Sequence, residues 1–490
     1  MAKWLPTALT FIPLLFTFII MFTPKEKELA IKLTALVGTG LVLLGAIYMV
    51  AAYDYARGGF QMAVKLPWIT AIGAQYNMAV DGISVPIVFL TALLTFICII
   101  ASWKINYRIK EYMGFMLFLE VGSIGVFLAL DFILFYVFWE IVLIPMYFLI
   151  GIWGGPRKEY AAIKFFLYTF VGSVFMLLGI LALYFYSGIN TFDMMALAKA
   201  HIPTLVIKLA FLGMFLGFAV KVPIVPFHTW LPDAHVEAPT AVSVLLAGVL
   251  LKMGSYAFIR IGLGVVPTGM KAFVWLIALL GVISIIYGAL CAMVQKDLKK
   301  LVAYSSVSHM GYIMLGIASM TAIGVSGAVL QMFSHGVITG MLFLVVGVIY
   351  ERSHTREIEK LGGILVSMSL IGGIWVYISL ASFGLPSLAG FVGEFLIIIG
   401  AFKFSHILAG IAALGIILTA GYLLWTIQRI CLGEPKTDEP WADASPRELA
   451  YMMPLLALIV VIGFFPGLVL RVIEPTTGAL MATVAKTGGM

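Results

Sequence analysis

Long apolar stretches, separated by short polar segments, follow one another along almost the whole chain. Each stretch is long enough to cross about 30 Å of hydrocarbon as a helix that rises about 1.5 Å per residue. They predict fourteen membrane-spanning helices, near residues 4–22, 29–52, 82–102, 113–129, 132–153, 162–187, 204–224, 239–262, 272–294, 301–318, 325–350, 366–402, 407–430 and 449–471. The longest pieces expected outside the bilayer are 53–81, 188–203, 225–238 and 431–448.

Composition supports a membrane protein and excludes a soluble one. Of the 490 residues, 62% are hydrophobic and only 11% are charged, whereas soluble domains carry about 25% charged residues. The first stretch follows a single lysine, Lys3, and no small-residue cleavage site comes after it. It is therefore interpreted as a first span and not as a signal peptide. A nucleic-acid partner is not expected.

Lysine and arginine are distributed unevenly between alternate connecting segments. With the N-terminus outside, the predicted inner segments and span edges hold eighteen of these residues and the outer ones hold nine. This bias is the one that orients membrane proteins, with the positive side in the cytoplasm. It predicts that both termini lie outside, and we favour a bacterial plasma membrane over a thylakoid.

Several ionisable residues lie within or beside apolar runs: Glu140 in "FYVFWEIVLIPMYF", Lys221 in "FAVKVPIVP", Lys252 in "VLLKMGSYAF", Glu394 in "AGFVGEFLIII", and also Glu120, His309 and His335. A charge at the bilayer centre costs about 2.5–3.5 kcal/mol on insertion scales, so such residues are usually paired or functional. As packing devices they would join helices as Glu–Lys pairs. As a functional set, acids, bases and histidines are what a proton relay requires. Arg260, near a span end, is expected to reach towards the membrane surface.

Two predicted spans are interrupted by helix-breaking residues at membrane depth. Pro223 and Pro226 follow Lys221, and Pro386 precedes Glu394 in "ASFGLPSLAGFVGEF". Irregular backbone in the bilayer is tolerated where it is buried in protein or lines a wet cavity. The breaks fall in helices seven and twelve, which suggests two inverted five-helix repeats. The predicted organisation is three N-terminal helices (1–112), a first repeat (113–262), a second repeat (263–430), and a final loop with helix fourteen (431–490).

Five quoted segments together resemble the antiporter-like membrane subunits of respiratory complex I, the proton-pumping NADH:quinone oxidoreductase: "FYVFWEIVLIPMYFLIGIWGG", "AAIKFFLYTFVGS", "KVPIVPFHTWLPDAHVEAPTAVSVLLAGVLLKMGSYAFIRIG", "AYSSVSHMGYIMLGI" and "LPSLAGFVGEF". The resemblance runs from about residue 80 to residue 430. Within the family, the M type carries glutamate at the position of Glu394, where the L and N types and the antiporter homologues carry lysine.

The resemblance implies roles for individual residues. Glu140 and Lys221 match the Glu–Lys pair of the family, Lys252 the central relay lysine, and Glu394 the terminal acid. His309 and His335 match the polar residues that connect the centre to helix twelve. A further group is expected either to fix the break or to take part in the relay: Glu120, His228, Asp233 and His235.

The expected function is proton export coupled to quinone reduction elsewhere in a complex, through a Glu–Lys–Lys–His–Glu relay. The expected partners are lipids and other complex I membrane subunits, with L-type and N-type neighbours. The chain has no nicotinamide fingerprint or P-loop, and Cys98, Cys291 and Cys431 lack metal-ligand spacing. FMN, iron–sulfur clusters and quinone are therefore expected in partner subunits, and no cofactor or metal in this chain.

Three alternatives remain at this point. The first is a subunit of an Na⁺/H⁺ antiporter or of a proton-pumping membrane hydrogenase. The second is a structural membrane subunit without a proton path, and the third is a stand-alone solute transporter, for which no substrate pocket is recognisable.

Overall fold

The computed structural model describes residues 2–436 and 441–487. Fourteen of the described helices are long and apolar enough to cross a membrane, which confirms the predicted class of polytopic helical membrane protein. The chain forms two compact units. The first unit comprises Met1–Val222, Val249–Leu276 and Arg471–Met490, and the second comprises Pro223–Gly248 and Ile277–Leu470.

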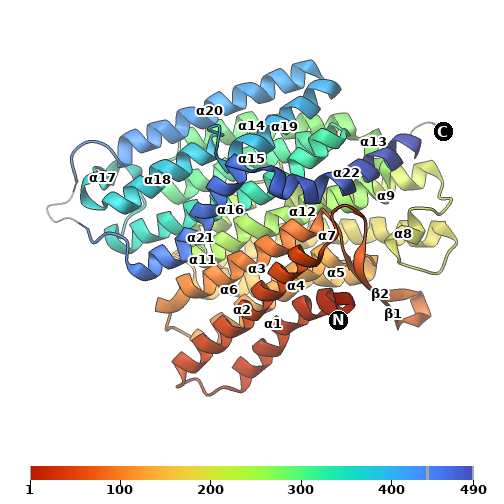
Figure 1. Ribbon diagram of the computed structural model, residues 1–490, viewed down its shortest axis with the longest axis horizontal. Helices are drawn as coiled ribbons and strands as arrows, with labels where there is room; N and C mark the ends of the chain where they lie inside the picture. Colours follow the sequence, from red (N-terminus) through yellow and green to blue (C-terminus); the bar gives the residue numbers. More distant parts are fainter. Residues whose placement is uncertain (1, 437–440, 488–490) are drawn as a thin grey trace. The chain divides into compact units, whose positions relative to one another are not determined.

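The first unit holds the N-terminal helices and a β-hairpin. Its elements are η1 (Ala2–Trp4), α1 (Leu5–Phe22), α2 (Glu28–Ala52), β1 (Gln61–Ile69), η2 (Thr70–Ile72), β2 (Ala74–Val80), α3 (Ser84–Ala101), η3 (Ser102–Lys104), α4 (Ile109–Leu128), α5 (Phe132–Ile141), α6 (Leu143–Trp153), α7 (Lys158–Ser187), α8 (Met194–Leu197), α9 (Thr204–Lys221), α12 (Leu251–Ala257), η5 (Phe258–Leu263) and α13 (Pro267–Ala272). Helix α1 packs on α2 and α4 (Figure 1).

The segment 53–81, which is expected to lie outside the bilayer, contains the β-hairpin. Strands β1 and β2 pair antiparallel, with Lys65 opposite Asn77 and an irregular register near each end of β1. Gly73 closes the turn at φ +69°, and a Cβ there would lie 2.0 Å from the Asn190 carbonyl oxygen. Only glycine fits this turn, because both its φ and the close neighbour disfavour a side chain.

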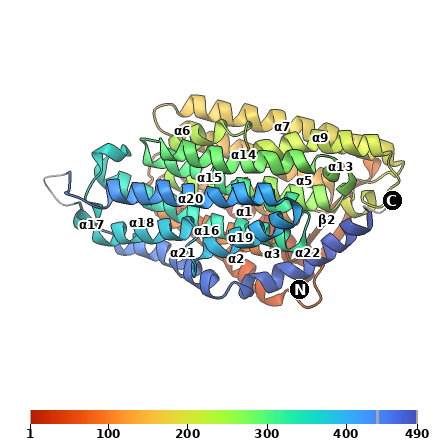
Figure 2. The same cartoon turned by 90° about the horizontal axis from the view of Figure 1, so that it is seen from above.

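Helices α7 and α9 run side by side in the first unit (Figure 2). Small residues line their contact: a Cβ on Gly179 would lie 2.4 Å from the Ala210 carbonyl oxygen, and one on Gly217 2.8 Å from that of Gly172. Close backbone approach through small residues is the usual way in which membrane helices gain packing energy without a hydrophobic driving force.

The second unit is built around the long helix α16. Its elements are α10 (Trp230–Glu237), α11 (Thr240–Leu245), most of α14 (Val274–Met293), α15 (Leu298–Ala318), α16 (Ala322–Ser353), η6 (Ile358–Lys360), α17 (Ile364–Ser367), α18 (Ser369–Ser382), α19 (Ala389–Phe404), α20 (His406–Ile430) and α21 (Pro446–Phe464). Helix α16 packs against α15 and α19. A Cβ on Gly400 would lie 2.4 Å from the Gly324 Cα, so glycines again bring two helices together.

Both predicted helix breaks are present. Helix α9 ends at Lys221 and the chain turns irregularly through Pro223 and Pro226 before α10. Helix α18 ends at Ser382, and α19 begins only after Pro386. Proline interrupts each helix because it lacks the backbone N–H that would continue the hydrogen-bond ladder.

The set of spans differs from the predicted set in two places. The predicted span 366–402 is divided between α18 and α19, neither of which is long enough to count as one span, whereas α22 (Gly467–Thr487) meets the length and composition of a span. In the first unit α22 lies against connecting segments: the Val472 carbonyl oxygen would be 2.0 Å from a Cβ on Gly82, and Arg471 lies 5.2 Å from the Tyr55 ring. Two helices, α21 and α22, therefore follow residue 431, where the sequence predicts one.

Candidate functional site

A buried acid and a buried lysine meet in the first unit. Glu140 lies one residue before the end of α5, and Lys221 is the last residue of α9. Pro145, four residues after Ile141, leaves the Ile141 carbonyl without a helical partner, which explains why the helix is interrupted between α5 and α6. The Glu140 carboxylate interacts electrostatically with Lys221 and lies within hydrogen-bonding reach of Ser173 and Tyr136.

The Lys221 side chain is buried and lies over an aromatic ring. The side chain is 1% exposed, and Nζ makes no hydrogen bond to any described residue. It lies 5.3 Å from the centre of the Trp139 ring, within the range of a cation–π contact. An ammonium with few fixed partners is well suited to gaining and losing a proton.

Lys252 lies on a helix that packs against α9, the helix of Lys221. It belongs to α12, a short α-helix between two π-helical segments, η4 (Leu246–Leu250) and η5, and it is fully buried. A Cβ on Gly254 would lie 2.9 Å from the Phe218 carbonyl oxygen, so α12 packs closely on the last turn of α9. π-Helical turns occur often at functional sites, where they change the direction of a side chain within a continuous helix.

Glu120 lies on α4 and is 1% exposed. Within the described part of the chain, neither of its carboxylate oxygens has a hydrogen-bond partner. It is therefore a further buried ionisable group of the first unit.

The second unit brings Glu394, His309 and His335 together. Glu394 lies in the first turns of α19, just after the break, and its Oε1 is 2.8 Å from His309 Nδ1 on α15. His309 Nε2 is 3.3 Å from Ser382 Oγ, at the end of α18. The rings of His309 and His335 are 5.5 Å apart, centre to centre. Two halves of a broken helix and two further helices thus meet at one polar cluster.

Gln331 completes this cluster and was not singled out from the sequence. Its amide Nε2 donates a hydrogen bond to Glu394 Oε1 at 3.0 Å. The close approach of α16 and α19 permits this contact, since a Cβ on Gly393 would lie 2.6 Å from Gln331 Oε1. A polar amide in the apolar run "GAVLQMFSHG" was the available signal, four residues before His335.

Two histidines of the "HTWLPDAH" element pack against aromatic rings. His228 packs edge-on against Tyr287 with ring centres 5.1 Å apart, and His235 stacks on Phe343 at 4.5 Å. Asp233 is only partly buried, in the first turn of α10.

The end of α10 is capped by two cations. Lys299 donates a hydrogen bond to the Ala238 carbonyl oxygen, and Arg356 Nη1 donates one to that of Val236 at 2.7 Å. Cations are stabilising at a helix C-terminus, where the last carbonyl groups lack helical partners. These contacts fix the return of the chain after the break.

The prediction for Arg260 is wrong. Arg260 does not reach towards the membrane surface but is buried, with Nη2 2.6 Å from Asp81 Oδ2 and Nε donating to the Tyr256 hydroxyl at 2.9 Å. Asp81 is 1% exposed. A buried guanidinium requires a carboxylate partner. Asp81, which is far from Arg260 in the sequence, supplies it.

Taken together, these groups are acids and bases of the kind that bind and release protons. Each unit has buried acids and bases at or beside a helix break. Among the described residues, no group of three or more His, Cys, Asp or Glu side chains could hold a metal ion.

The chain matches a family of membrane proteins over most of its central region. The family model for the transmembrane region of the NADH:quinone oxidoreductase/Mrp antiporter proteins matches residues 129–419. The NADH-quinone oxidoreductase subunit M of Rickettsia prowazekii is 43% identical over 470 residues, which cover 94% of this chain and 95% of that protein. The subunit M of Rhodobacter capsulatus is 45% identical over 465 residues, covering 92% and 90%.

A solved structure agrees with these sequence matches. A chain of the respiratory complex I from Thermus thermophilus with bound NADH superposes with a TM-score of 0.90 and 31% sequence identity. The match covers 99% of the present chain and 100% of the other.

Proposed function

The chain belongs to the NADH:quinone oxidoreductase/Mrp antiporter membrane family, and on this premise we propose that it is the M-type proton-translocating subunit of an NADH:quinone oxidoreductase. The chain itself carries out no redox chemistry in this proposal. Its contribution to the enzyme is a path of buried ionisable groups through which protons cross the membrane.

In the first unit, Glu140 controls how firmly Lys221 holds its proton. An opposite charge nearby favours the ionised lysine, and loss of that charge favours release. The Lys221 ammonium makes no hydrogen bond within the described chain. The Glu140 carboxylate is therefore the main charged partner whose movement away would change how firmly Lys221 holds its proton. The released proton has Lys252, on the helix packed against α9, as its next acceptor.

In the second unit, the terminal steps involve His335, His309 and Glu394. The hydrogen bond between His309 and Glu394 gives a proton a direct transfer between imidazole and carboxylate. The family resemblance supplies the order, from the lysines of the first unit to these residues. Each charge moved against 100 mV requires about 2.3 kcal/mol, which the redox reaction of the complex must supply.

The finer assignments follow from the same proposal. FMN, iron–sulfur clusters and quinone belong to partner subunits, and L-type and N-type subunits are the neighbours. The membrane is the bacterial plasma membrane, with both termini outside. Residues 113–262 and 263–430 form the two inverted repeats. The positive-inside bias of the connecting segments supports this orientation.

One observation supports the proposal most strongly: the 2.8 Å contact of His309 with Glu394 at the break of a membrane helix. A carboxylate that only joined helices would need no break beside it. An ionisable pair beside irregular backbone in the bilayer is typical of an ion-carrying site.

The test is proton pumping by membrane vesicles that contain the intact complex. Lys221→Ala and Glu140→Ala are each expected to reduce NADH-driven pumping and coupled quinone reduction severely while the complex still assembles. Lys208→Ala, an exposed lysine on the same helix α9, is the matched control and is expected to pump normally. Normal pumping by both Lys221→Ala and Glu140→Ala would contradict the role of the pair and favour a structural subunit.

A further inference from the structure

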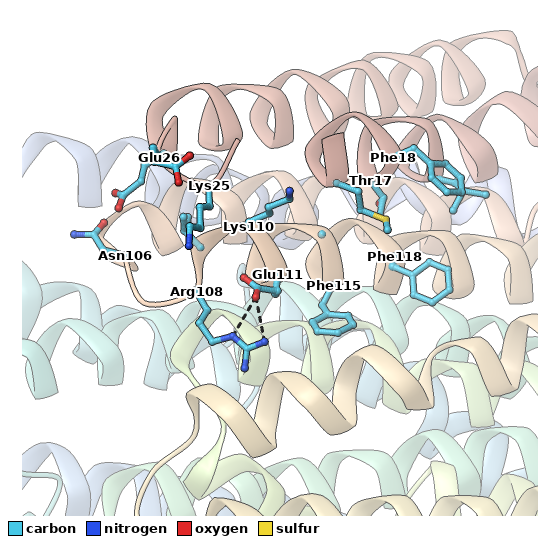
Figure 3. A pocket seen from close by; sticks show the side chains of 15 residues that line it. Thr17, Phe18, Lys25, Glu26, Asn106, Arg108, Lys110, Glu111, Phe115 and Phe118 are labelled. Carbon is cyan, nitrogen blue, oxygen red and sulfur yellow. Dashed lines mark hydrogen bonds and ion pairs between the residues drawn. The ribbon is translucent and has the colours of Figure 1, made fainter. Parts of the chain in front are cut away.

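The first unit contains a large groove that the proton path does not use. It lies along α1 and α4 and has a volume of about 1110 Å³. Pockets for small molecules usually measure about 300–1,000 Å³, so this groove is large for such a ligand. In Figure 3 charged and amide side chains gather at one end, while Phe18, Phe115 and Phe118 lie towards the other.

The length of the groove matches one leaflet of a bilayer. Its lining runs from Arg108, just before α4, to Phe118 on α4, ten residue steps that rise about 15 Å in a helix. Half of a hydrocarbon core of about 30 Å has the same depth. The walls below the mouth are apolar, from Leu14, Phe18 and Met21 on α1 and from Phe115 and Phe118 on α4. An acyl chain fits these walls.

The mouth of the groove has both signs of charge in equal number. Its residues are Lys25, Arg108, Lys110, Glu26, Glu28, Glu111 and Asn106. Arg108 and Glu111 already form an ion pair, with Nη2 3.0 Å from Oε1 (Figure 3). The two lysines, Lys25 and Lys110, and the two other glutamates, Glu26 and Glu28, also line the mouth.

We propose that this groove binds a phospholipid with a zwitterionic phosphoethanolamine head group. The phosphate lies against Lys25 and Lys110, and the ammonium group donates hydrogen bonds to Glu26 and Glu28. The acyl chains lie between α1 and α4. This site is independent of the proton path proposed above.

The charges of the mouth discriminate between head groups. A choline head group is a cation without an N–H, so it can meet the charge of the exposed Glu26 and Glu28 carboxylates but cannot donate a hydrogen bond to them. An anionic glycerol head group meets the lysines but faces the same two carboxylates with no cation to offer. The phosphoethanolamine group alone among these three complements both pairs in charge and in hydrogen bonding.

Photocrosslinking in the intact membrane complex tests the proposal. The residue Phe118, at the apolar end, is replaced by p-benzoyl-phenylalanine, and the complex is reconstituted in vesicles of equal parts phosphatidylethanolamine, phosphatidylcholine and phosphatidylglycerol. After illumination, the mass of the adduct on α4 identifies the occupant. The expected adduct is phosphatidylethanolamine in clear excess over the other two lipids.

Two variants in one loop form a matched pair. Lys25→Gln is expected to reduce the phosphatidylethanolamine adduct about fivefold, because a lysine at the surface contributes about 1 kcal/mol to binding a lipid phosphate. Lys27→Gln, two residues away and outside the lining, is expected to leave it unchanged. Gly114→Phe fills the groove and should abolish the adduct. Gly114→Ala should preserve it, because an added Cβ meets only Thr17 Cγ2, at 4.0 Å.

Other outcomes would overturn the proposal. An adduct on a neighbouring subunit would show that a protein helix fills the groove. Equal labelling of the three lipids, or equal effects of Lys25→Gln and Lys27→Gln, would show that the mouth does not recognise a head group. Absence of any adduct, both from the complex with the photoreactive residue at position 118 and from the same complex with Gly114→Ala, would exclude an occupant.

Discussion

Replacing Arg260 by methionine is expected to destabilise the first unit strongly. The substitution leaves Asp81 as an unpaired charge at 1% exposure, and removing one partner of a buried ion pair costs about 3–5 kcal/mol. It also removes the donor to the Tyr256 hydroxyl and the contact with Phe60, whose ring centre is 4.9 Å from the guanidinium carbon. The lower end of that range, about 3 kcal/mol, corresponds to a roughly 100-fold rise in the population of opened molecules.

Cys98 provides a local probe of this opening. It is fully buried on α3, the helix that begins three residues after Asp81. Labelling of Cys98 by a thiol reagent in the intact complex, followed by mass spectrometry, reports how often this part of the first unit opens. Arg260→Met is expected to raise the labelling rate about 100-fold, while pumping by the molecules that remain folded is retained.

A double variant separates the ion pair from simple loss of packing. Asp81→Asn keeps an acceptor for the Ile83 and Ser84 N–H groups, which Asp81 Oδ1 now binds at 3.1 and 3.0 Å, but carries no charge. In that background Arg260→Met is expected to cost much less than in the parent chain. Parent-like labelling of Cys98 in Arg260→Met, or strictly additive effects in the double variant, would refute the reasoning.

Three further predictions concern other parts of the chain. Gln331→Leu removes the hydrogen bond to Glu394 and is expected to slow pumping roughly tenfold, since a hydrogen bond to a charged group contributes about 1.5 kcal/mol or more; an unchanged rate would contradict it. Burial raises the pKa of Asp131 to about 6, although backbone N–H groups oppose the shift. Its contribution to stability therefore falls as the pH rises from about 4 to about 6. The hydrogen-exchange protection of residues 129–135 should lose this pH dependence in Asp131→Asn. The same pH dependence in both proteins would contradict the prediction. Gly82→Ala should displace α22, because its Cβ would lie 2.0 Å from the Val472 carbonyl oxygen, and unchanged protease sensitivity of α22 would count against this contact.

The sequence was most informative about residues whose placement in the bilayer costs free energy. Charged residues in apolar runs, such as Lys221 and Glu394, stand out because the bilayer penalises them. The helix breaks could also be predicted, since Pro223 and Pro386 cannot continue a hydrogen-bond ladder. These two local signals identify both places where buried ionisable groups gather.

Features that depend on distant partners could not be predicted in this way. Asp81 and Arg260 are separated by 179 residues, so the sequence near Arg260 gave no indication of an ion pair. Gln331 became part of the cluster at Glu394 only because glycines bring α16 and α19 together. The hairpin of 61–80 lacks regular alternation of apolar and polar residues, and its irregular register explains why the pattern was missed.

The central claim is that Glu394 carries protons, and the most direct measurement is the number of protons pumped per NADH oxidised in vesicles with Glu394→Gln and Glu394→Asp. Glutamine can accept the hydrogen bonds of Gln331 and His309 but cannot take up a proton, whereas aspartate can. The account predicts a strong loss of pumping in Glu394→Gln and near-normal pumping in Glu394→Asp. Full pumping by both variants would contradict it.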